Sequence, residues 1–372
     1  MIPVNSVELT SREQELLIEC IKTGWISSEG PFVAEFENGM AERVGRRYGV
    51  AVSSGSAALD VAVKALGIGA LDEVIMPAFT IISCASAVVK NGALPVLVDI
   101  DQHTWNMKAE DVAHKITDRT RAVMAVHTYG LPVDMDPLLE LCRSKGLLLI
   151  EDAAEQIGQT YHGRACGSFG DISVLSFYAN KHVTTGEGGM VLTDDPHIAR
   201  RCRSLRNLCF EEHQRFVHKE LGWNYRMTNL QAAVGVAQLE RLDETIAKKR
   251  RMGNYYNELL SGTPGLQLPE IRGVGAESIF WVYGVAVDEK VPFNAADIMG
   301  RLKEKGIGTR PFFWPMHWQP VFREMGLFDG DAHPVSERLA THGFYLPSGS
   351  AMTPNEIRTC AEALNEIMTH AV

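Results

Sequence analysis

Between about residues 48 and 195, short apolar runs rich in Val and Ile alternate with stretches whose apolar residues recur at helical spacing. This alternation is typical of α/β layering around a largely parallel sheet. The pattern predicts seven strands in one layer, at residues 48–53, 73–76, 94–99, 121–127, 147–151, 172–177 and 189–193. Helices are expected between the strands, for example at residues 57–66 and 137–145, with glycines at or beyond their ends.

A long helical pattern opens the second part of the chain, from Thr228 to about Leu260, and residues 228–231 have capping-box spacing. The basic run at residues 248–251 is expected to be a solvated helix face rather than a nucleic-acid patch. After a break at residues 261–265, the pattern changes to that of a smaller α+β unit. Its predicted elements are strands at 280–287 and 307–313 and helices at 294–305 and 354–368.

The chain of 372 residues is therefore expected to form two domains, a large one at residues 1–240 and a small one at 241–372. Acidic residues number 46 and basic residues 36, so the net charge is −10. This charge has the wrong sign for wrapping nucleic acid or an anionic bilayer. Any phosphate ligand must therefore be bound at a local site.

The ends and the cysteines suggest a cytoplasmic protein. The first residues lack the basic and apolar regions of a secretory signal, and the longest uncharged stretch, at 74–89, is too short for a membrane span. Seven cysteines are scattered without Cys-x-x-Cys spacing, which indicates neither a disulfide framework nor a zinc site. We expect reduced thiols that fill the core, with no metal and no membrane partner.

A turn of small residues, Ser-Ser-Gly-Ser-Ala-Ala-Leu at 53–59, follows the first predicted strand. Gly55 lets the backbone approach a ligand closely, and Ser56 with the free N–H groups of the next helix can hold a phosphate. A plain strand-to-helix turn with serine caps would look the same. The turn is neither the Gly-x-Gly-x-x-Gly of a dinucleotide fold nor a Walker loop.

Carboxylates follow the apolar strand at 147–151. An acid such as Asp152 at a buried strand end is costly without a cationic partner, and a protonated pyridine nitrogen would be one. The alternative role is a helix N-cap. Glu155 lies one helical turn further along and is expected on the same side, whereas Glu151 is expected to be a solvated or salt-bridged neighbour.

A lysine follows the strand at 172–177, ahead of a loop with three glycines among residues 186–189. By itself Lys181 would be an ordinary exposed loop lysine. In a desolvated site, however, a lysine amine can titrate low enough to attack a carbonyl and form a Schiff base. A phosphate turn, a strand-end aspartate and a loop lysine, all at the ends of strands, form the set of groups that pyridoxal 5'-phosphate (PLP) requires.

Several longer motifs extend this pattern over essentially the whole chain, at residues 24–28, 180–190, 224–229, 309–311 and 315–317. Through them the sequence resembles the DegT/DnrJ/EryC1/StrS sugar aminotransferases, and the motif at 180–190 is the most specific. The resemblance implies the PLP-dependent transferase fold of type I. It also implies that the large domain binds PLP and that the smaller C-terminal α+β domain closes over it.

The resemblance also implies roles for individual residues. Lys181 looks like the Schiff-base lysine, Asp152 like the partner of the pyridinium nitrogen, and Glu155 like the residue near the ring hydroxyl. Positions that bind the cofactor phosphate in this family match Gly55, Ser56, Ser176 and, from the neighbouring subunit, Asn224. The active site would then be shared across a homodimer.

The implied reaction moves an amino group from an amino acid, with glutamate as the expected donor, to the keto carbon of a nucleotide-linked deoxysugar. A different nucleotide ketosugar or a small phosphorylated ketone remains an alternative acceptor. A ketosugar 3-dehydratase would carry histidine in place of Lys181, and here His182 merely follows it. A non-enzymatic regulator would need a DNA-reading element, and the sequence has neither a helix-turn-helix pattern nor a basic stripe.

Three further residues bear on this site. Arg310 is expected to face the cleft and to pair with the donor carboxylate or the nucleotide phosphates. His127 follows a buried strand and is expected to be a hydrogen-bonded structural histidine rather than a residue that lines the pocket. Ile81 stands where relatives usually carry an aromatic residue over the pyridine ring, which forfeits roughly 0.5–1.5 kcal/mol of stacking unless Phe79 compensates.

Overall fold

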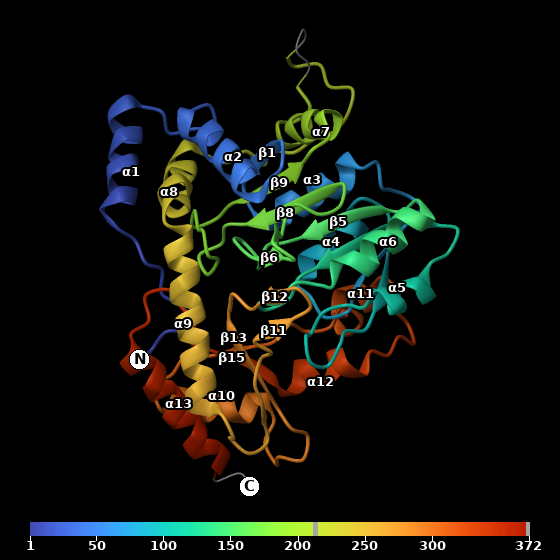
Figure 1. Cartoon of the computed structure of the whole chain (residues 1–372). Helices are drawn as coiled ribbons and strands as arrows, with labels where there is room; N and C mark the ends of the chain where they lie inside the picture. The colour runs from blue at the N-terminus through green and yellow to red at the C-terminus, as the bar shows by residue number, and fades with distance from the viewer. Residues whose placement is uncertain (211–214, 370–372) are drawn as a thin grey trace.

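The computed structural model describes residues 1–210 and 215–369, and its largest element is a seven-stranded sheet (Figure 1). The strand order is β1-β9-β8-β5-β4-β2-β3. The strands are β1 (Tyr48–Val52), β2 (Glu73–Pro77), β3 (Leu94–Val98), β4 (Thr120–Val126), β5 (Leu148–Asp152), β8 (Ile172–Ser176) and β9 (Gly189–Thr193). Only β9 runs against its neighbours, β1 and β8. The predicted sheet is confirmed, and each strand end lies within one residue of its predicted place.

Both faces of the sheet are buried. Successive side chains of each strand point to opposite sides, so each strand contributes to two core clusters. On β4, Val123 and Ala125 join one core cluster, and Met124 and Val126 join the other. The first cluster includes α2 (Pro31–Val44), α6 (Met135–Lys145) and α8 (Asn229–Glu240), and the second includes α3 (Gly55–Ala65), α4 (Ile82–Lys90) and α7 (Pro196–Arg206). Helix α1 (Ser11–Thr23) packs along α8, and α5 (Ala109–Lys115) packs against β3.

A second, four-stranded antiparallel sheet forms the centre of the C-terminal region, residues 241–369, in the order β10-β13-β15-β14. Its strands are β10 (Leu266–Gln267), β13 (Tyr283–Val287), β14 (Arg310–Pro311) and β15 (Gly343–Leu346). Around it lie α9 (Leu242–Leu260), α10 (Ala295–Glu304), α12 (Pro334–His342) and α13 (Pro354–Thr369). Short elements complete the fold: hairpins β6 (Thr160–Tyr161) with β7 (Arg164–Ala165) and β11 (Arg272–Gly273) with β12 (Ala276–Glu277), the 3-10 turn Met316–Trp318 and α11 (Pro320–Glu324).

Three of the predicted C-terminal elements were wrong in part. The single helix from Thr228 to Leu260 is two helices, because Arg241 leaves the helical conformation at φ −116° and ψ 18°. The strand expected at 280–287 begins only at Tyr283, since Phe280 has a left-handed φ of 49°. The strand expected at 307–313 is reduced to β14, where Pro311 has no N–H to give to a ladder. Helices α10 and α13 agree with their predictions within one residue.

Helix α9 and the first residues of the chain tie the two sheets together. In Figure 1, α9 runs from the side of the large sheet down to α13, and the N-terminus lies beside it. Ile2 pairs with Ile307, and the N–H of Ser348 donates to the carbonyl of Val4 at 3.0 Å. The basic run on α9 was expected to be solvated, yet Lys249 is only 4% exposed. That prediction is wrong for the one residue of the run that lies on the buried face of the helix.

Two sequence-based expectations concern the whole chain. All seven cysteines are free and buried, in agreement with their expected place in the core. Within residues 1–210 and 215–369, every helix is too short or too polar to cross a bilayer.

Candidate active site

A cavity of about 360 Å³ lies at the C-terminal ends of the central strands, facing the C-terminal region. Six of the eight predicted site residues line it: Gly55, Ser56, Asp152, Glu155, Ser176 and Lys181. Three aromatic residues of the C-terminal region form its opposite wall: Trp281, Phe313 and Tyr345. The structure therefore brings the three separate sequence features together in one place.

The turn after β1 presents the N-terminus of α3 to the cavity. Ser54 caps this helix by accepting a hydrogen bond from the Ala57 N–H at 3.1 Å. A Cβ added to Gly55 would lie 2.8 Å from the Cβ of Ser176, so no larger residue fits without a shift. Ser56 shares a hydrogen bond of 2.7 Å with Ser83, near the start of α4. Free N–H groups and serine hydroxyls around a backbone cradle are groups that suit a phosphate.

Asp152 ends β5 as a buried carboxylate with little hydrogen bonding from the protein. Its oxygens accept from the Ala154 N–H at 3.0 Å and from the Cys84 thiol at 3.3 Å. Burial raises the pKa of Asp152 above its usual value, and these two hydrogen bonds oppose the change. A cation at the cavity would remove much of this desolvation cost. The geometry thus agrees better with a ligand partner than with a helix N-cap alone.

Glu155 and Lys181 form a buried ion pair beside Asp152. Their side-chain atoms Oε1 and Nζ are 3.7 Å apart, and the second Glu155 oxygen accepts from the Tyr129 N–H at 2.9 Å. Burial raises the pKa of Glu155 to about 7, against the attraction of the Lys181 ammonium. Burial also lowers the pKa of Lys181, while Glu155 and Asp152 act in the opposite direction. A perturbed amine between two carboxylates in a cleft is typical of a reactive site.

Trp281 is a site residue that the sequence did not indicate. Its ring lies over the Lys181 ammonium, with Nζ 3.7 Å from the ring centroid. It comes from the stretch just before β13, a hundred residues after Lys181 in the chain. No local motif marks such a residue, because only the folded chain brings the two segments together.

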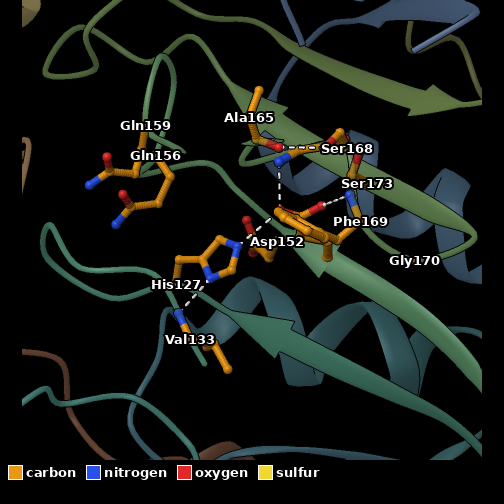
Figure 2. A network of polar contacts seen from close by, with 12 residues as sticks. His127, Val133, Asp152, Gln156, Gln159, Ala165, Ser168, Phe169, Gly170 and Ser173 are labelled. Atoms are coloured by element: carbon orange, nitrogen blue, oxygen red, sulfur yellow. Dashed lines mark hydrogen bonds and ion pairs between the residues drawn. The ribbon is translucent and has the colours of Figure 1, made fainter. Parts of the chain in front are cut away.

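A polar network behind Asp152 holds His127 in one orientation (Figure 2). The His127 Nδ1 accepts from the Val133 N–H at 3.0 Å, and its Nε2 lies 2.9 Å from a Glu151 oxygen. Glu151 is fully buried and also accepts from the N–H of Gly167 at 2.5 Å and of Phe169 at 2.7 Å. The expected hydrogen-bonded histidine is therefore present, and it also lines the cavity. Of the two alternatives for Glu151, the solvated one is wrong, since Glu151 is buried against His127.

Of the remaining predicted residues, Arg310 and Asn224 do not line this cavity, whereas Ile81 does. Arg310 lines a neighbouring cavity of about 230 Å³, which shares the residues Tyr178, Asn180, Trp281 and Tyr345 with the first. Asn224 is exposed and pairs with Asn207. Ile81 lines the main cavity and is 42% exposed, whereas Phe79 is fully buried in an aromatic cluster with Tyr129 and Phe312.

The residues present suit PLP. The cradle at Gly55 fits a phosphate, the Asp152 carboxylate suits a protonated ring nitrogen, and the Lys181 amine suits an aldehyde carbon. Asn180, which also lines the cavity, has a buried Oδ1 without a partner among the described residues. These groups and the fold together define the class of PLP-dependent aminotransferases.

Comparison with known proteins agrees with this class. The model of the DegT/DnrJ/EryC1/StrS aminotransferase family matches residues 7–365. The chain is 39% identical to a GDP-perosamine synthase of Caulobacter vibrioides, over 99% of this chain and 98% of that protein. It is 38% identical to a GDP-perosamine synthase of Escherichia coli O157:H7, over 98% of each. A likeness of the motifs to GDP-perosamine synthases in particular, which the sequence suggests within the family, is thereby confirmed.

A solved structure supports the same conclusion. The aminotransferase TlmJ from Streptoalloteichus hindustanus superposes with a TM-score of 0.91 at 31% identity, over 100% of this chain and 99% of that one. The protein belongs to the DegT/DnrJ/EryC1/StrS aminotransferase family and is a PLP-dependent enzyme.

Proposed function

We propose that the enzyme transfers an amino group from an amino acid, with glutamate as donor, to C4 of GDP-4-keto-6-deoxymannose. The observation that carries this proposal is the cavity in which Lys181, Asp152 and Glu155 meet beside a phosphate cradle. The choice of acceptor rests on the relatives named GDP-perosamine synthase, at 38–39% identity over nearly the whole chain. A product of this kind would serve polysaccharide synthesis, such as that of O-antigen.

Lys181 is the proposed catalytic residue. When bound, PLP supplies an aldehyde that takes up the amino group and a ring that accepts electrons. The Lys181 amine would hold the aldehyde carbon between turnovers and, once released, would move the proton to and from the substrate carbon. Its place beside Glu155, 3.7 Å away, supports this second role, because Glu155 can take part in balancing the charge of the amine.

The other predicted residues would bind and orient the cofactor. Asp152 would keep the proton on the ring nitrogen, and Glu155 would lie near the ring hydroxyl. The phosphate would be held by the backbone at Gly55 and by the hydroxyls of Ser56 and Ser176. Two observations support this arrangement: the space at Gly55 admits no side chain, and Asp152 accepts few hydrogen bonds from the protein.

Arg310 is the proposed anion-binding residue for the substrate. It lines the neighbouring cavity, which shares a wall with the main one at Trp281 and Tyr345. Its guanidinium can pair with a carboxylate of the donor or a phosphate of the nucleotide through two parallel hydrogen bonds.

The acceptor can be tested directly with enzyme loaded with pyridoxamine phosphate. Each candidate ketone is added, and loss of the absorbance of this amine form reports transfer. The proposal predicts rapid loss with GDP-4-keto-6-deoxymannose and slower loss with dTDP- or UDP-linked ketosugars. Reaction with a small keto phosphate alone would contradict the nucleotide-sugar acceptor without affecting the assignment as an aminotransferase.

We also propose a homodimer whose active sites are shared, with Asn224 reaching the cofactor phosphate of the neighbouring subunit. Its support is that Asn224 is exposed and stands apart from the residues lining the cavity of its own chain.

The further proposals are a domain boundary near residue 240, beside the break at Arg241, and a cytoplasmic location, which suits seven buried free thiols.

Mixed dimers test the shared site. When Lys181→Ala and Asn224→Ala chains are combined, a mixed dimer has one site that carries both changes and one that carries neither. Activity should therefore reappear on mixing the two variants, at up to about one quarter of the native activity for random pairing of equal amounts, because half of the dimers are mixed and each has one intact site. No recovery, with mixed dimers shown to form, would place Asn224 outside the neighbouring site.

A further inference from the structure

The backbone that presents Lys181 is attached at several points to segments distant in the sequence. The indole N–H of Trp281 donates to the carbonyl of Asn180 at 3.1 Å. His182 Nε2 lies 3.2 Å from the carbonyl of Ile279, and Asn5 donates to the carbonyl of Ala179 at 3.2 Å. Residues on both sides of Lys181 are thus bound by side chains or carbonyls outside their own loop.

The state of His182 is settled by its surroundings. It is buried, and burial lowers its pKa to about 3, with Lys249 adding to the effect. A neutral ring whose Nε2 faces a carbonyl must donate its proton there. The bond to Ile279 is therefore a true tether between the lysine loop and the stretch before β13.

Trp281 is itself fixed from the opposite side. Its carbonyl accepts from the ammonium of Lys249 at 2.7 Å, and the same ammonium also donates to the carbonyl of Ser348. Trp281 is 5% exposed and stacks near Tyr129, at 5.7 Å between ring centroids. Both ends of the residue are therefore held, so its ring and its N–H can hold Lys181 in turn.

We infer that Trp281 is a positioning residue for Lys181, which it holds toward the cavity through its N–H to Asn180 and its ring over the Lys181 amine. The inference rests on the proposed role of Lys181 as the lysine that bonds to the cofactor. Its consequence is that the C-terminal region sets the place of an amine carried by the large sheet. Loss of the indole N–H should therefore slow bond formation between Lys181 and PLP without weakening the rest of the site.

Trp281→Phe tests this, because it removes the N–H and keeps an aromatic ring. In chains freed of cofactor, saturating PLP is added, and absorbance follows the bond that joins the Lys181 nitrogen to the aldehyde carbon with loss of water. Affinity is measured separately for pyridoxine phosphate, which has an alcohol in place of the aldehyde. We expect the rate to fall about 3- to 10-fold, the effect of one hydrogen bond, with the affinity unchanged within about twofold.

Trp105→Phe is the matched control. Trp105 is 3% exposed, and its indole N–H has no partner among the described residues, so the change removes the same atoms but no hydrogen bond. It should leave both the rate and the affinity within about twofold of the native values. Trp281→Leu, which loses the ring as well, should be slower than Trp281→Phe.

Two results would overturn the inference: a Trp281→Phe rate equal to that of Trp105→Phe, or a joint fall of rate and pyridoxine phosphate affinity, which would indicate general damage. Lys181→Ala distinguishes a failure of the inference about Trp281 from a failure of the proposed role of Lys181. It should form no lysine-bound absorbance yet bind pyridoxine phosphate normally. If Lys181→Ala still forms that absorbance, the role of Lys181 itself is wrong, whatever Trp281→Phe does.

Discussion

Two buried lysines contact the same tryptophan from opposite sides, and their surroundings differ. Lys181 lies over the ring of Trp281 and 3.7 Å from the Glu155 carboxylate, in the wall of a cavity. Lys249 donates to the carbonyls of Trp281 and Ser348, and no carboxylate pairs with it within residues 1–210 and 215–369. Burial lowers the pKa of both amines, that of Lys249 to about 7.

On the proposed role of Lys181, burial and a lowered pKa do not by themselves identify a reactive lysine. A cavity adjoins the Lys181 amine, and nearby carboxylates can stabilise its protonated form. An amine that reacts and moves protons needs both the space and the charged partners. The Lys249 amine donates to two carbonyls, that of Trp281 before β13 and that of Ser348 after β15, and so joins α9 to both stretches. On the proposed roles, the bonding of Lys181 changes during the reaction and that of Lys249 does not.

The largest expected effect separates the two amines by their chemistry. Lys181→Ala should lower turnover by at least about 10³-fold while cofactor still binds, because both the covalent anchor and the proton carrier are lost. Lys249→Met should keep the absorbance of lysine-bound cofactor and reduce turnover by less than about tenfold. Reduction of the cofactor bond with borohydride, followed by peptide mapping, should place the label on Lys181. A label on Lys249 would reverse the comparison.

The carboxylates around Lys181 are the next difference to test. Asp152→Asn keeps the shape but cannot hold a proton on the ring nitrogen by charge, so turnover should fall on the order of 10²-fold. Cys84→Ala removes the thiol that donates to an Asp152 oxygen at 3.3 Å, and it should reduce turnover far less than Asp152→Asn does. Steady-state rates with the donor amino acid measure both. Equal losses would mean that Asp152 acts through packing and not through its charge.

A smaller effect concerns stability and belongs to Lys249. Its pKa is about 7 in the folded chain and about 10.4 in an unfolded chain. Between these values the unfolded chain binds a proton that the folded chain lacks, so stability rises with pH across this window, by up to about 1.4 kcal/mol per pH unit. Urea unfolding of native and Lys249→Met chains should show a shallower rise in the Lys249→Met chain than in the native chain.

The same experiment compares the two regions if Lys181→Met is added, with all chains in the cofactor-free state. Glu155 and Asp152 counteract the effect of burial on the Lys181 pKa, so its removal should flatten the pH dependence less than the removal of Lys249. A larger effect from Lys181 would show that its carboxylates compensate its burial poorly.

Much of the large sheet and of the Lys181 region could be predicted from sequence, for a physical reason. Buried parallel strands are near-continuous apolar runs, and the groups at their ends, such as Asp152 and Lys181, follow them directly in the chain. Site residues that lie close to a strand in the sequence therefore also lie close to it in the folded protein. The C-terminal strands were predicted less well, because Phe280 and Pro311 interrupt patterns that still look apolar.

The Lys249 region and Trp281 could not be predicted in this way. Trp281 contacts Lys181 only through the packing of one sheet region against the other, which no spacing records. For Lys249 a signal did exist: Ile246, Lys249, Met252 and Tyr256 follow at intervals of three and four and all lie on the buried face of α9. The four-residue basic run concealed this periodicity.

The smallest expected effect concerns the open side of the Lys181 region, where Ile81 lines the cavity and is 42% exposed. Ile81→Phe would place an aromatic ring there and should slow cofactor release about 2- to 10-fold, as expected for roughly 0.5–1.5 kcal/mol of stacking. The slower release should be seen with pyridoxamine phosphate, which Lys181 does not bind covalently. It should be largely hidden with PLP, because Lys181 binds PLP covalently. Loss of absorbance after dilution measures both rates.

Ile82→Phe is the control for this last change, because Ile82 is 36% exposed and adjacent but is not among the residues that line the cavity. It should leave both release rates unchanged. If Ile81→Phe slows the release of PLP as much as that of pyridoxamine phosphate, the covalent bond to Lys181 contributes little to retention. The contrast between the two lysines would then lie in proton transfer alone, since anchoring would no longer distinguish Lys181 from Lys249.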